Sequence, residues 1–272
     1  MIETIVRRAE RCARWITDPR TQSELHRLRS EERYVPGQTT LLHHPVQYVD
    51  AASFLSAYRA IFEEEIYTFV PESDSPTIID GGANVGLATL YWKKKWPDAD
   101  ITAFEPAPQV FRALEWNCDQ HGYTDVDLIR RGLWSEDTTL QFNPDGADSG
   151  HLESSDCTIT EDAQDEMVSV PVVRLARFLD QPVDLLKLDI EGAETEVLVD
   201  CEEALHTVEH LFVEYHSYVD QEQRLDEVLS VLKDSGFRIH IQPELVAEKP
   251  FVQRLESHGM DHRLNIFAYR NR

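Results

Sequence analysis

The chain has 272 residues, a formal net charge of −24 at pH 7 and a pI of about 4.7. This length allows one large domain with an appendage. Because so acidic a surface repels phosphate groups, we expect neither a nucleic acid nor an anionic membrane as a partner. No apolar run reaches the roughly 18 residues of a membrane span, and the N-terminus lacks the apolar segment of a signal peptide. We therefore expect a cytoplasmic protein with no integral membrane part.

Lysine is scarce in this acidic sequence, and arginine supplies most of the positive charge. A strongly acidic surface keeps a protein hydrated and soluble at high salt, so we interpret the composition as halophilic. We expect the midpoint of thermal unfolding to rise between low and molar KCl. A falling midpoint would contradict this interpretation.

The cysteines are few and scattered. Cys12, Cys118, Cys157 and Cys201 show no C-x-x-C spacing. The pattern predicts neither a zinc site nor a disulfide framework. Reduced thiols of this kind agree with the expected cytoplasmic location.

The first segment, residues 1–33, has apolar residues at helical spacing with arginines between them. A basic amphipathic helix can lie on a membrane surface, but we favour packing on the acidic domain of this chain or on a second copy. A homo-oligomer is therefore a candidate assembly. Two short strands are expected within 40–49, and a helix over 50–69 with Asp50 as its N-cap.

Strands and helices alternate after a polar linker at 71–76. The strands are expected at 77–80, 100–105 and 126–130, and the helices at 86–96 and 108–121. Such alternation predicts a doubly wound parallel sheet with helices on both faces, whose ligands bind at the carboxyl ends of the strands. We expect an N-terminal helical extension over 1–75 and a cofactor-binding catalytic domain over 76–272.

The first of these strands runs directly into the glycine-rich stretch D-G-G-A-N-V-G at 80–86. Glycines permit positive φ and a close approach of a ligand to the main chain. The helix that follows offers unpaired N–H groups at its N-terminus. The stretch predicts a nucleotide-type site, with the following candidate cofactor-binding residues: Asp80, Gly81, Gly82, Asn84 and Gly86.

The kind of cofactor follows from what this stretch lacks. It matches neither the G-x-G-x-x-G dinucleotide fingerprint nor the phosphate-binding P-loop. Asp80 at the strand tip would repel a pyrophosphate but suits a cationic ligand. S-adenosylmethionine, with a sulfonium and an ammonium, is therefore favoured over NAD.

Three further residues are candidates for cofactor contacts. Glu105 ends the second strand, where an acidic residue commonly accepts hydrogen bonds from ribose hydroxyls; a solvated carboxylate is the alternative. Leu133 and Trp134 follow the third strand and are candidates for packing against adenine. Packing in the core is equally open for both.

Residues 143–166 are rich in Asp, Glu, Ser and Gly. Loops of this length are commonly functional lids or disordered insertions, and both interpretations stay open: a lid over the acceptor or a solvated insertion. A strand at 169–173 and a short helix at 175–179 follow.

A second polar group follows the two next expected strands, at 184–188 and 209–215. Asp189 and Glu191 come after the first strand, and Glu214 and His216 end the second. The carboxyl ends of such strands meet at one edge of a sheet, so we expect these side chains to converge. They are candidate general bases, with Asp189 and Glu191 preferred. Asp189 is also a candidate cofactor contact, and Asp189, Glu214 and His216 are candidate Mg²⁺ ligands.

The remaining elements close the sheet. Lys187, inside a buried strand, is expected to pair with a carboxylate. A helix is expected over 219–235 and strands over 237–241 and 264–269. The insertion between these strands, 243–262, is expected to help line the acceptor pocket.

Four motifs carry a resemblance to a known family. D-G-G-A-N-V-G, A-F-E-P, K-L-D-I-E-G-A-E and V-E-Y-H, within about residues 50–269, resemble those of the FkbM family of S-adenosylmethionine-dependent methyltransferases. The resemblance implies a class I methyltransferase (Rossmann-like) α/β fold with a mostly parallel seven-stranded sheet and an antiparallel edge strand. It implies O-methylation of a sugar, glycan or natural-product hydroxyl, with the cofactor held by Asp80, Gly81, Asn84, Gly86 and Glu105. Residues 173–177 lack the expected T-L-D, and 1–49 are not covered.

The mechanism we expect is in-line methyl transfer to an acceptor oxygen held roughly 3 Å from the methyl group. A carboxylate or His216 would remove the hydroxyl proton. One rival is a non-catalytic partner that binds S-adenosylmethionine within an assembly. Another is a nicotinamide-dependent dehydrogenase on the same sheet, which lacks its fingerprint here.

Overall fold

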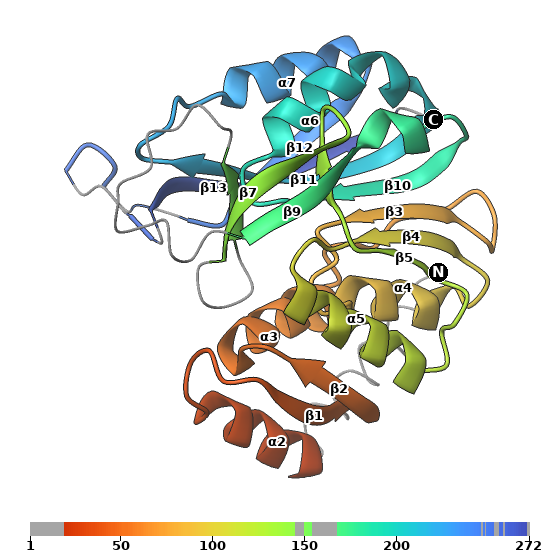
Figure 1. Cartoon of the computed structure of the whole chain (residues 1–272), viewed down its shortest axis with the longest axis vertical. Helices are drawn as coiled ribbons and strands as arrows, with labels where there is room; N and C mark the ends of the chain where they lie inside the picture. Colours follow the sequence, from red (N-terminus) through yellow and green to blue (C-terminus); the bar gives the residue numbers. More distant parts are fainter. Residues whose placement is uncertain are drawn as a thin grey trace.

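A computed structural model describes residues 19–144, 150–153, 168–245, 247, 249–252, 256–257 and 259–270. Its centre is a seven-stranded sheet in the order β12-β13-β11-β10-β3-β4-β5 (Figure 1). The strands are β3 (Thr77–Gly81), β4 (Asp100–Phe104), β5 (Asp127–Ile129), β10 (Val183–Leu188), β11 (Val208–Tyr218), β12 (Arg238–Pro243) and β13 (Met260–Tyr269). β13 is antiparallel to both of its neighbours, whereas the pairs β11-β10, β10-β3, β3-β4 and β4-β5 are parallel. The expected class I methyltransferase fold is confirmed, with the antiparallel strand next to the edge strand β12.

Helices cover both faces of this sheet. They are α4 (Leu87–Lys95) and α5 (Pro108–Gln120) on one face, and α6 (Glu194–Cys201) and α7 (Leu225–Asp234) on the other (Figure 1). Alternating strand residues explain the two layers: Ile78 belongs to the hydrophobic core beneath α4, whereas Ile79 packs in the core beneath α6 and α7. Burial on both faces accounts for the nearly continuous apolar sequence of the central strands.

One helix is shorter than the sequence predicts. α7 begins at Leu225, whereas we expected a helix from residue 219. The reason is that β11 continues to Tyr218, and the N–H of Val219 donates to the carbonyl of Gly259 at 2.9 Å instead of joining a helix. No helix in the described part of the chain is long and apolar enough to cross a membrane.

A second, four-stranded sheet lies beside the first, in the order β6-β9-β7-β8. Its strands are β6 (Gly132–Trp134), β7 (Thr138–Pro144), β8 (Gly150–Glu153) and β9 (Val168–Arg174). β7 and β8 pair as an antiparallel hairpin, so part of the segment expected to be a loop over 143–166 is strand. The remainder of that segment, 145–149 and 154–167, lies outside the described residues, and so does the lid expected there.

The N-terminal segment is not only helical. It contains α2 (Pro19–Arg29), an antiparallel pair β1 (Gly37–Leu42) and β2 (His44–Tyr48), α3 (Ala51–Tyr58) and a π-helical turn η1 (Arg59–Glu63). Asp50 caps α3 as predicted, because its carboxylate accepts a hydrogen bond from the N–H of Ser53 at 2.9 Å. Residues 1–18 lie outside the described part.

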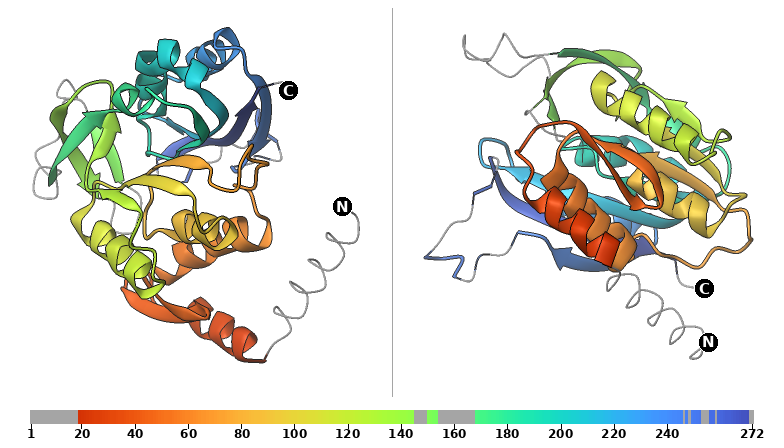
Figure 2. Two further views of the ribbon diagram at one scale, coloured as in Figure 1. Left: turned by 90° about the vertical axis from the view of Figure 1, so that its right-hand side faces the viewer. Right: turned by 90° about the horizontal axis from the view of Figure 1, so that it is seen from below.

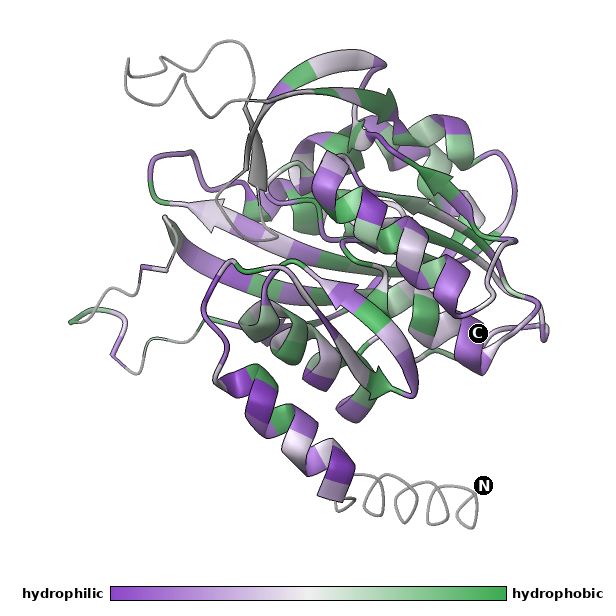
Figure 3. Ribbon diagram, turned by 60° about the horizontal axis from the view of Figure 1, so that its bottom comes forward, coloured by the Kyte–Doolittle hydropathy of each residue, from purple (hydrophilic) through white to green (hydrophobic). Residues whose placement is uncertain are grey.

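This segment packs against helices of the seven-stranded sheet. Figures 1 and 2 show α3 and the β1-β2 hairpin beneath α4 and α5. Phe54 of α3 and Trp92 of α4 belong to one hydrophobic core. The amide of Asn117 on α5 donates to the carbonyl of Gln47 on β2, and Gln47 N–H donates back. Hydrophilic residues predominate along α2, which lies on the outside (Figure 3). The expected boundary at residue 75, between the N-terminal extension and the domain that follows it, stays a proposal.

Candidate active site

A cavity of about 290 Å³ lies between the carboxyl ends of the central strands and the N-terminal segment. Its lining includes the glycine loop (Gly82, Ala83, Asn84, Val85), the ends of β10 and β11 (Lys187, Asp189, Glu191, Glu214), the helical wall of α3 and η1 (Ser53, Phe54, Ala57, Ala60, Ile61) and the edge formed by β13 (Met260, Arg263, Asn265). The position agrees with ligand binding at the carboxyl ends of parallel strands. The π-helical turn in its wall is a feature that recurs at functional sites.

The glycine loop packs so closely against its neighbours that two of its positions have no room for a side chain. Gly82 has φ of +74°, and a Cβ there would lie 1.8 Å from the carbonyl oxygen of Asp189. Gly86 has φ of +89°, and a Cβ there would lie 2.6 Å from Cδ1 of Leu114. Both positions therefore require glycine, for backbone conformation and for space.

Asp80 lies beneath this loop and does not line the cavity. Its side chain is 0% exposed, Oδ2 accepts a hydrogen bond from Thr89 at 2.9 Å, and Oδ1 lies 3.2 Å from Nζ of Lys187. Nζ also donates to the carbonyls of Gly81 and Gly82, at 3.1 and 2.7 Å. The predicted pairing of Lys187 is present. Asp80 neutralises a buried cation here and supports the loop from below, and a contact between Asp80 and the cofactor stays a prediction.

Lys187 keeps its charge in this setting. Burial opposes the charged form, but the carboxylates of Asp80 and Asp189 outweigh it and raise the pKa of Lys187. As a cation, Lys187 therefore contacts three groups. They are the Asp80 carboxylate under the loop, the loop carbonyls, and Asp189, whose Oδ2 lies 3.6 Å from Nζ.

Glu105 and Asn84 fix the loop from its other side. Glu105 is buried, and its two carboxylate oxygens accept hydrogen bonds from the N–H groups of Ala107 at 2.8 Å and Asn84 at 3.0 Å. Burial raises the pKa of Glu105 to about 7, although these N–H groups oppose the shift. Asn84 has φ of 51°, and its Oδ1 accepts from Val85 N–H at 2.6 Å. Contact between Glu105 and a ribose stays a prediction.

Leu133 packs in the core. Its side chain is almost fully buried, and its Cδ1 lies where a Cβ on Gly81 would meet it at 2.7 Å. Trp134 is partly buried against the core on the same side. Neither residue is among those that line the cavity. Core packing, which the sequence left open, therefore describes Leu133, and contact between Trp134 and adenine remains a prediction.

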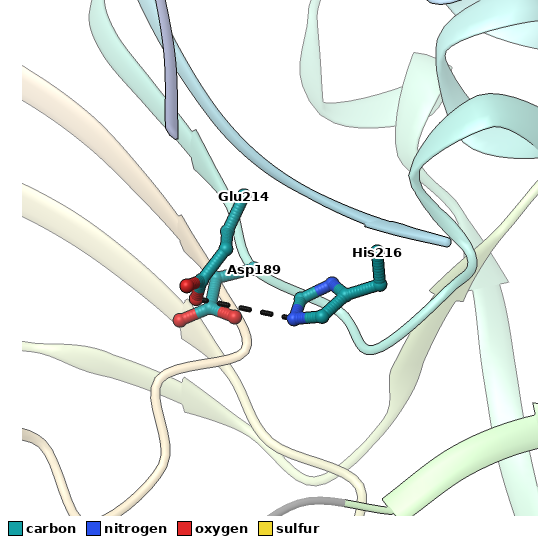
Figure 4. A group of neighbouring side chains, drawn as sticks. All are labelled: Asp189, Glu214 and His216. Atoms are coloured by element: carbon teal, nitrogen blue, oxygen red, sulfur yellow. Dashed lines mark ion pairs between the residues drawn. The ribbon is translucent and has the colours of Figure 1, made fainter. Parts of the chain in front are cut away.

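The structure brings the four predicted catalytic candidates together; Asp189, Glu191 and Glu214 line the cavity, whereas His216 is not among its lining residues. One ligand atom each of Asp189, Glu214 and His216 lies within 4.8 Å of the others (Figure 4). Nε2 of His216 lies 3.5 Å from Glu191 Oε2 and 4.0 Å from Glu214 Oε2. A single imidazole therefore faces carboxyl groups from two strand ends.

Glu194 joins this group, although the sequence did not single it out as a site residue. It is 1% exposed, and its Oε1 lies 3.0 Å from Nδ1 of His216 and accepts a hydrogen bond from Ile190 N–H. Both oxygens also accept from Gly192 N–H. The sequence explains this carboxylate as a favourable first-turn residue of α6. Its contact with His216 is apparent only in the fold, where β11 lies beside β10 and brings His216 to the start of α6.

The charges in this group differ from those of isolated side chains. Burial opposes a charge on His216, but Glu194 and Glu191 outweigh it and raise its pKa well above the ordinary value. Burial works against ionised Asp189, yet Lys187 and His216 lower its pKa. The histidine therefore favours its imidazolium form, in which Nδ1 donates to Glu194 Oε1, and Asp189 favours its carboxylate form.

The other two carboxyl groups hold protons more tightly. Burial and the nearby Asp189 carboxylate raise the pKa of Glu214 well above its ordinary value. Burial also raises the pKa of Glu191 to about 7, partly offset by His216. Glu214 therefore favours its protonated form, and Glu191, whose pKa is about 7, is divided between its two forms at neutral pH. The groups titrate as a coupled set.

A divalent cation fits this group poorly. Two of its candidate ligands already face cations, since Lys187 lies beside Asp189 and Nε of Arg263 lies 3.4 Å from Glu214 Oε1. The third, His216, is held as an imidazolium by Glu194. Mg²⁺ prefers unprotonated oxygen ligands and several waters. We derive no step through Mg²⁺.

Comparison with known proteins gives a family. The model described as "Methyltransferase FkbM domain" matches residues 80–239. Methyltransferase 1 of Beauveria bassiana is 35% identical over 52% of this chain and 64% of its own length, so the chain spans less than two thirds of that relative. The 31-O-demethyl-FK506 methyltransferase FkbM of Streptomyces tacrolimicus is 29% identical over 71% of this chain and 85% of its own. The hexuronic acid methyltransferase AglP of Haloferax volcanii is 31% identical over 58% and 64%, respectively.

Proposed function

The chain belongs to the methyltransferase FkbM domain family of S-adenosylmethionine-dependent enzymes, and from this premise we propose that it methylates a hydroxyl group of a sugar, glycan or natural product. The observation that carries the proposal is one cavity that joins the glycine loop to the group around His216. Names of relatives support an acceptor of this class, since one refers to 31-O-demethyl-FK506 and another to a hexuronic acid.

The cofactor would lie along the glycine loop. Gly82 and Asn84 line the cavity, and α4 begins at Leu87, directly after the loop in the chain. Asp189, ionised and at the same end of the cavity, is placed to balance the ammonium of the cofactor, a role that the sequence gave to Asp80. Bound there, S-adenosylmethionine supplies an activated methyl group on its sulfonium. The protein then has to position the acceptor oxygen in line and accept its proton.

Glu191 is the group best suited to take that proton. A general base works best when its pKa lies near the operating pH, and the pKa of Glu191 is about 7. The lowered pKa of Asp189 makes it a weaker base, and the raised pKa of Glu214 favours its protonated form, which cannot take a further proton. His216, fixed by Glu194, lies 3.5 Å from Glu191 and stabilises its ionised form before transfer.

Calorimetric titration with S-adenosylmethionine, S-adenosylhomocysteine and NADH tests the premise. We expect the first two ligands to bind and NADH not to bind, because the loop has no dinucleotide fingerprint. Added Mg²⁺ should leave the affinities unchanged. Binding of NADH, or no binding of S-adenosylhomocysteine to folded protein, would refute the proposal.

A further inference from the structure

One buried polar atom in the wall of the cavity has no partner within the described residues. Asn265 on β13 is 4% exposed and lines the cavity. Its Nδ2 donates to Oε1 of Glu244 at 2.6 Å, but its Oδ1 accepts no hydrogen bond. The carboxylate of Glu244 can only accept from the amide, so the orientation of the amide is determined by chemistry.

The neighbours of Asn265 on the sheet explain why this oxygen is unpaired. On β11 the residue directly opposite is Glu214, whose carboxyl group interacts with Asp189 and lies 3.4 Å from Nε of Arg263. Of the two adjacent pairs along this face, Phe212 and Phe267 pack edge to face and offer no donor, whereas the donors of His216 and Arg263 face carboxylates. A buried acceptor without a donor is costly, and such atoms in native proteins generally meet a ligand or water.

We propose that Oδ1 of Asn265 accepts a hydrogen bond from a second hydroxyl of the methyl acceptor. The inference rests on the proposed function, which places the reacting hydroxyl beside Glu191. Glu214 links the two positions, because it lies opposite Asn265 and within 4.0 Å of His216, which in turn contacts Glu191. An acceptor that reaches both positions carries at least two hydroxyl groups. Asn265 is then a positioning residue that selects the orientation of the acceptor.

The charges along this edge favour a polyhydroxylated ring over an apolar one. Glu244, Arg263 and Asn265 all line the same side of the cavity, with Arg263 Nη2 at 3.9 Å from Glu244 Oε2. An apolar substituent placed there would displace water from these groups without replacing the hydrogen bonds that the water makes to them. The hydroxyl groups of a sugar ring replace them.

Binding to the protein loaded with S-adenosylhomocysteine tests the inference. The probes are the methyl glycosides of glucose, galactose, mannose and glucuronic acid, with cyclohexanol as the ring that has a single hydroxyl. We expect at least one glycoside to bind and cyclohexanol to bind at least about tenfold more weakly, since an unpaired buried acceptor penalises a ligand without a donor. Asn265→Ala should weaken the glycoside by about tenfold or more and leave the affinity for S-adenosylhomocysteine unchanged.

Gln242→Ala is the matched control. Gln242 pairs with Asn265 across the sheet, but it is exposed and outside the cavity lining, so glycoside affinity should not change. A monodeoxy series of the bound glycoside on unaltered protein gives a second test that needs no stable variant. Removing one particular hydroxyl should reduce the affinity about tenfold. The affinity of that deoxy sugar should be the same for Asn265→Ala as for the unaltered protein.

Several outcomes would overturn the inference. They are equal binding of cyclohexanol, equal glycoside affinity in Asn265→Ala, a deoxy series in which no hydroxyl matters, and no glycoside bound by protein that still binds S-adenosylhomocysteine. Loss of S-adenosylhomocysteine binding in Asn265→Ala would assign the residue to the cofactor and overturn it as well. Failure of the unaltered, folded protein to bind S-adenosylhomocysteine would instead refute the proposed function.

Discussion

Gly82→Ala is expected to abolish cofactor binding and methyl transfer. The new Cβ would lie 1.8 Å from the carbonyl oxygen of Asp189, far inside contact distance, and that oxygen belongs to the backbone. The backbone there has little room to yield, because Asp189 N–H donates to the carbonyl of Gly81 at 3.2 Å and β10 is paired along β3. Either the loop or Asp189 must therefore move by about an ångström, enough to lower turnover about 100-fold or more.

Gly122→Ala provides a matched control for this substitution. Gly122 has φ of +75°, almost the value at Gly82, but a Cβ there would meet nothing within 4 Å. Both variants therefore carry the cost of alanine in the left-handed region, on the order of 1–2 kcal/mol. Only Gly82→Ala carries the clash. Thermal unfolding and titration with S-adenosylmethionine measure the difference. Equal affinities in the two variants would show that the loop does not need its close approach to Asp189.

The part of the site that the sequence predicts is the part carried by local chemistry. A glycine loop between a strand and a helix has a local cause, and Gly82 and Gly86 have the positive φ values that such a loop requires. The cap at Asp50 is local in the same way. Alternating strands and helices connect in a few preferred ways, so the parallel sheet with helices on both faces could be predicted as well.

Pairing between distant strands decides the rest. Asp80 looks like a ligand contact in the sequence, because nothing nearby in the chain neutralises it. Its partner is Lys187, which reaches it only because β3 and β10 are neighbours in register. Asn265 is on the last strand and enters the site only because β13 inserts beside β11. Such contacts depend on strand order and register, which local sequence patterns do not determine.

The N-terminal segment shows the same limit on a larger scale. Its sequence pattern predicts helices and two short strands within 40–49, and the structure has α2, α3 and the β1-β2 pair there. The β1-β2 hairpin between them and the π-helical turn after them place this segment against α4 and α5. As a result, α3 and η1 form one wall of the cavity. The sequence leaves this role open, because an amphipathic helix does not specify the surface on which it packs.

Glu191→Gln is expected to lower kcat by about 10²–10⁴-fold, the usual contribution of a general base. The side chain keeps its size and its place beside His216, so the affinity for S-adenosylmethionine should change little. The pH dependence gives a sharper test. The base must be ionised to accept a proton, and burial raises the pKa of Glu191 to about 7. The kcat of the unaltered protein should therefore rise with pH through about 7 and fall at lower pH, and Glu191→Gln should lose this rise.

Two features of the site set the conditions for this measurement. The pKa of Glu105 is also raised to about 7, and its titration would alter the hold on the glycine loop and hence cofactor binding. The profile should therefore be measured as kcat with saturating S-adenosylmethionine, so that cofactor affinity does not contribute. Glu214→Gln is the control, because burial and the nearby Asp189 favour the protonated form of Glu214 and glutamine reproduces that neutral form. Its loss of kcat should be much smaller than that of Glu191→Gln. The opposite order, with the pH-dependent rise retained in Glu191→Gln, would transfer the role of base to Glu214.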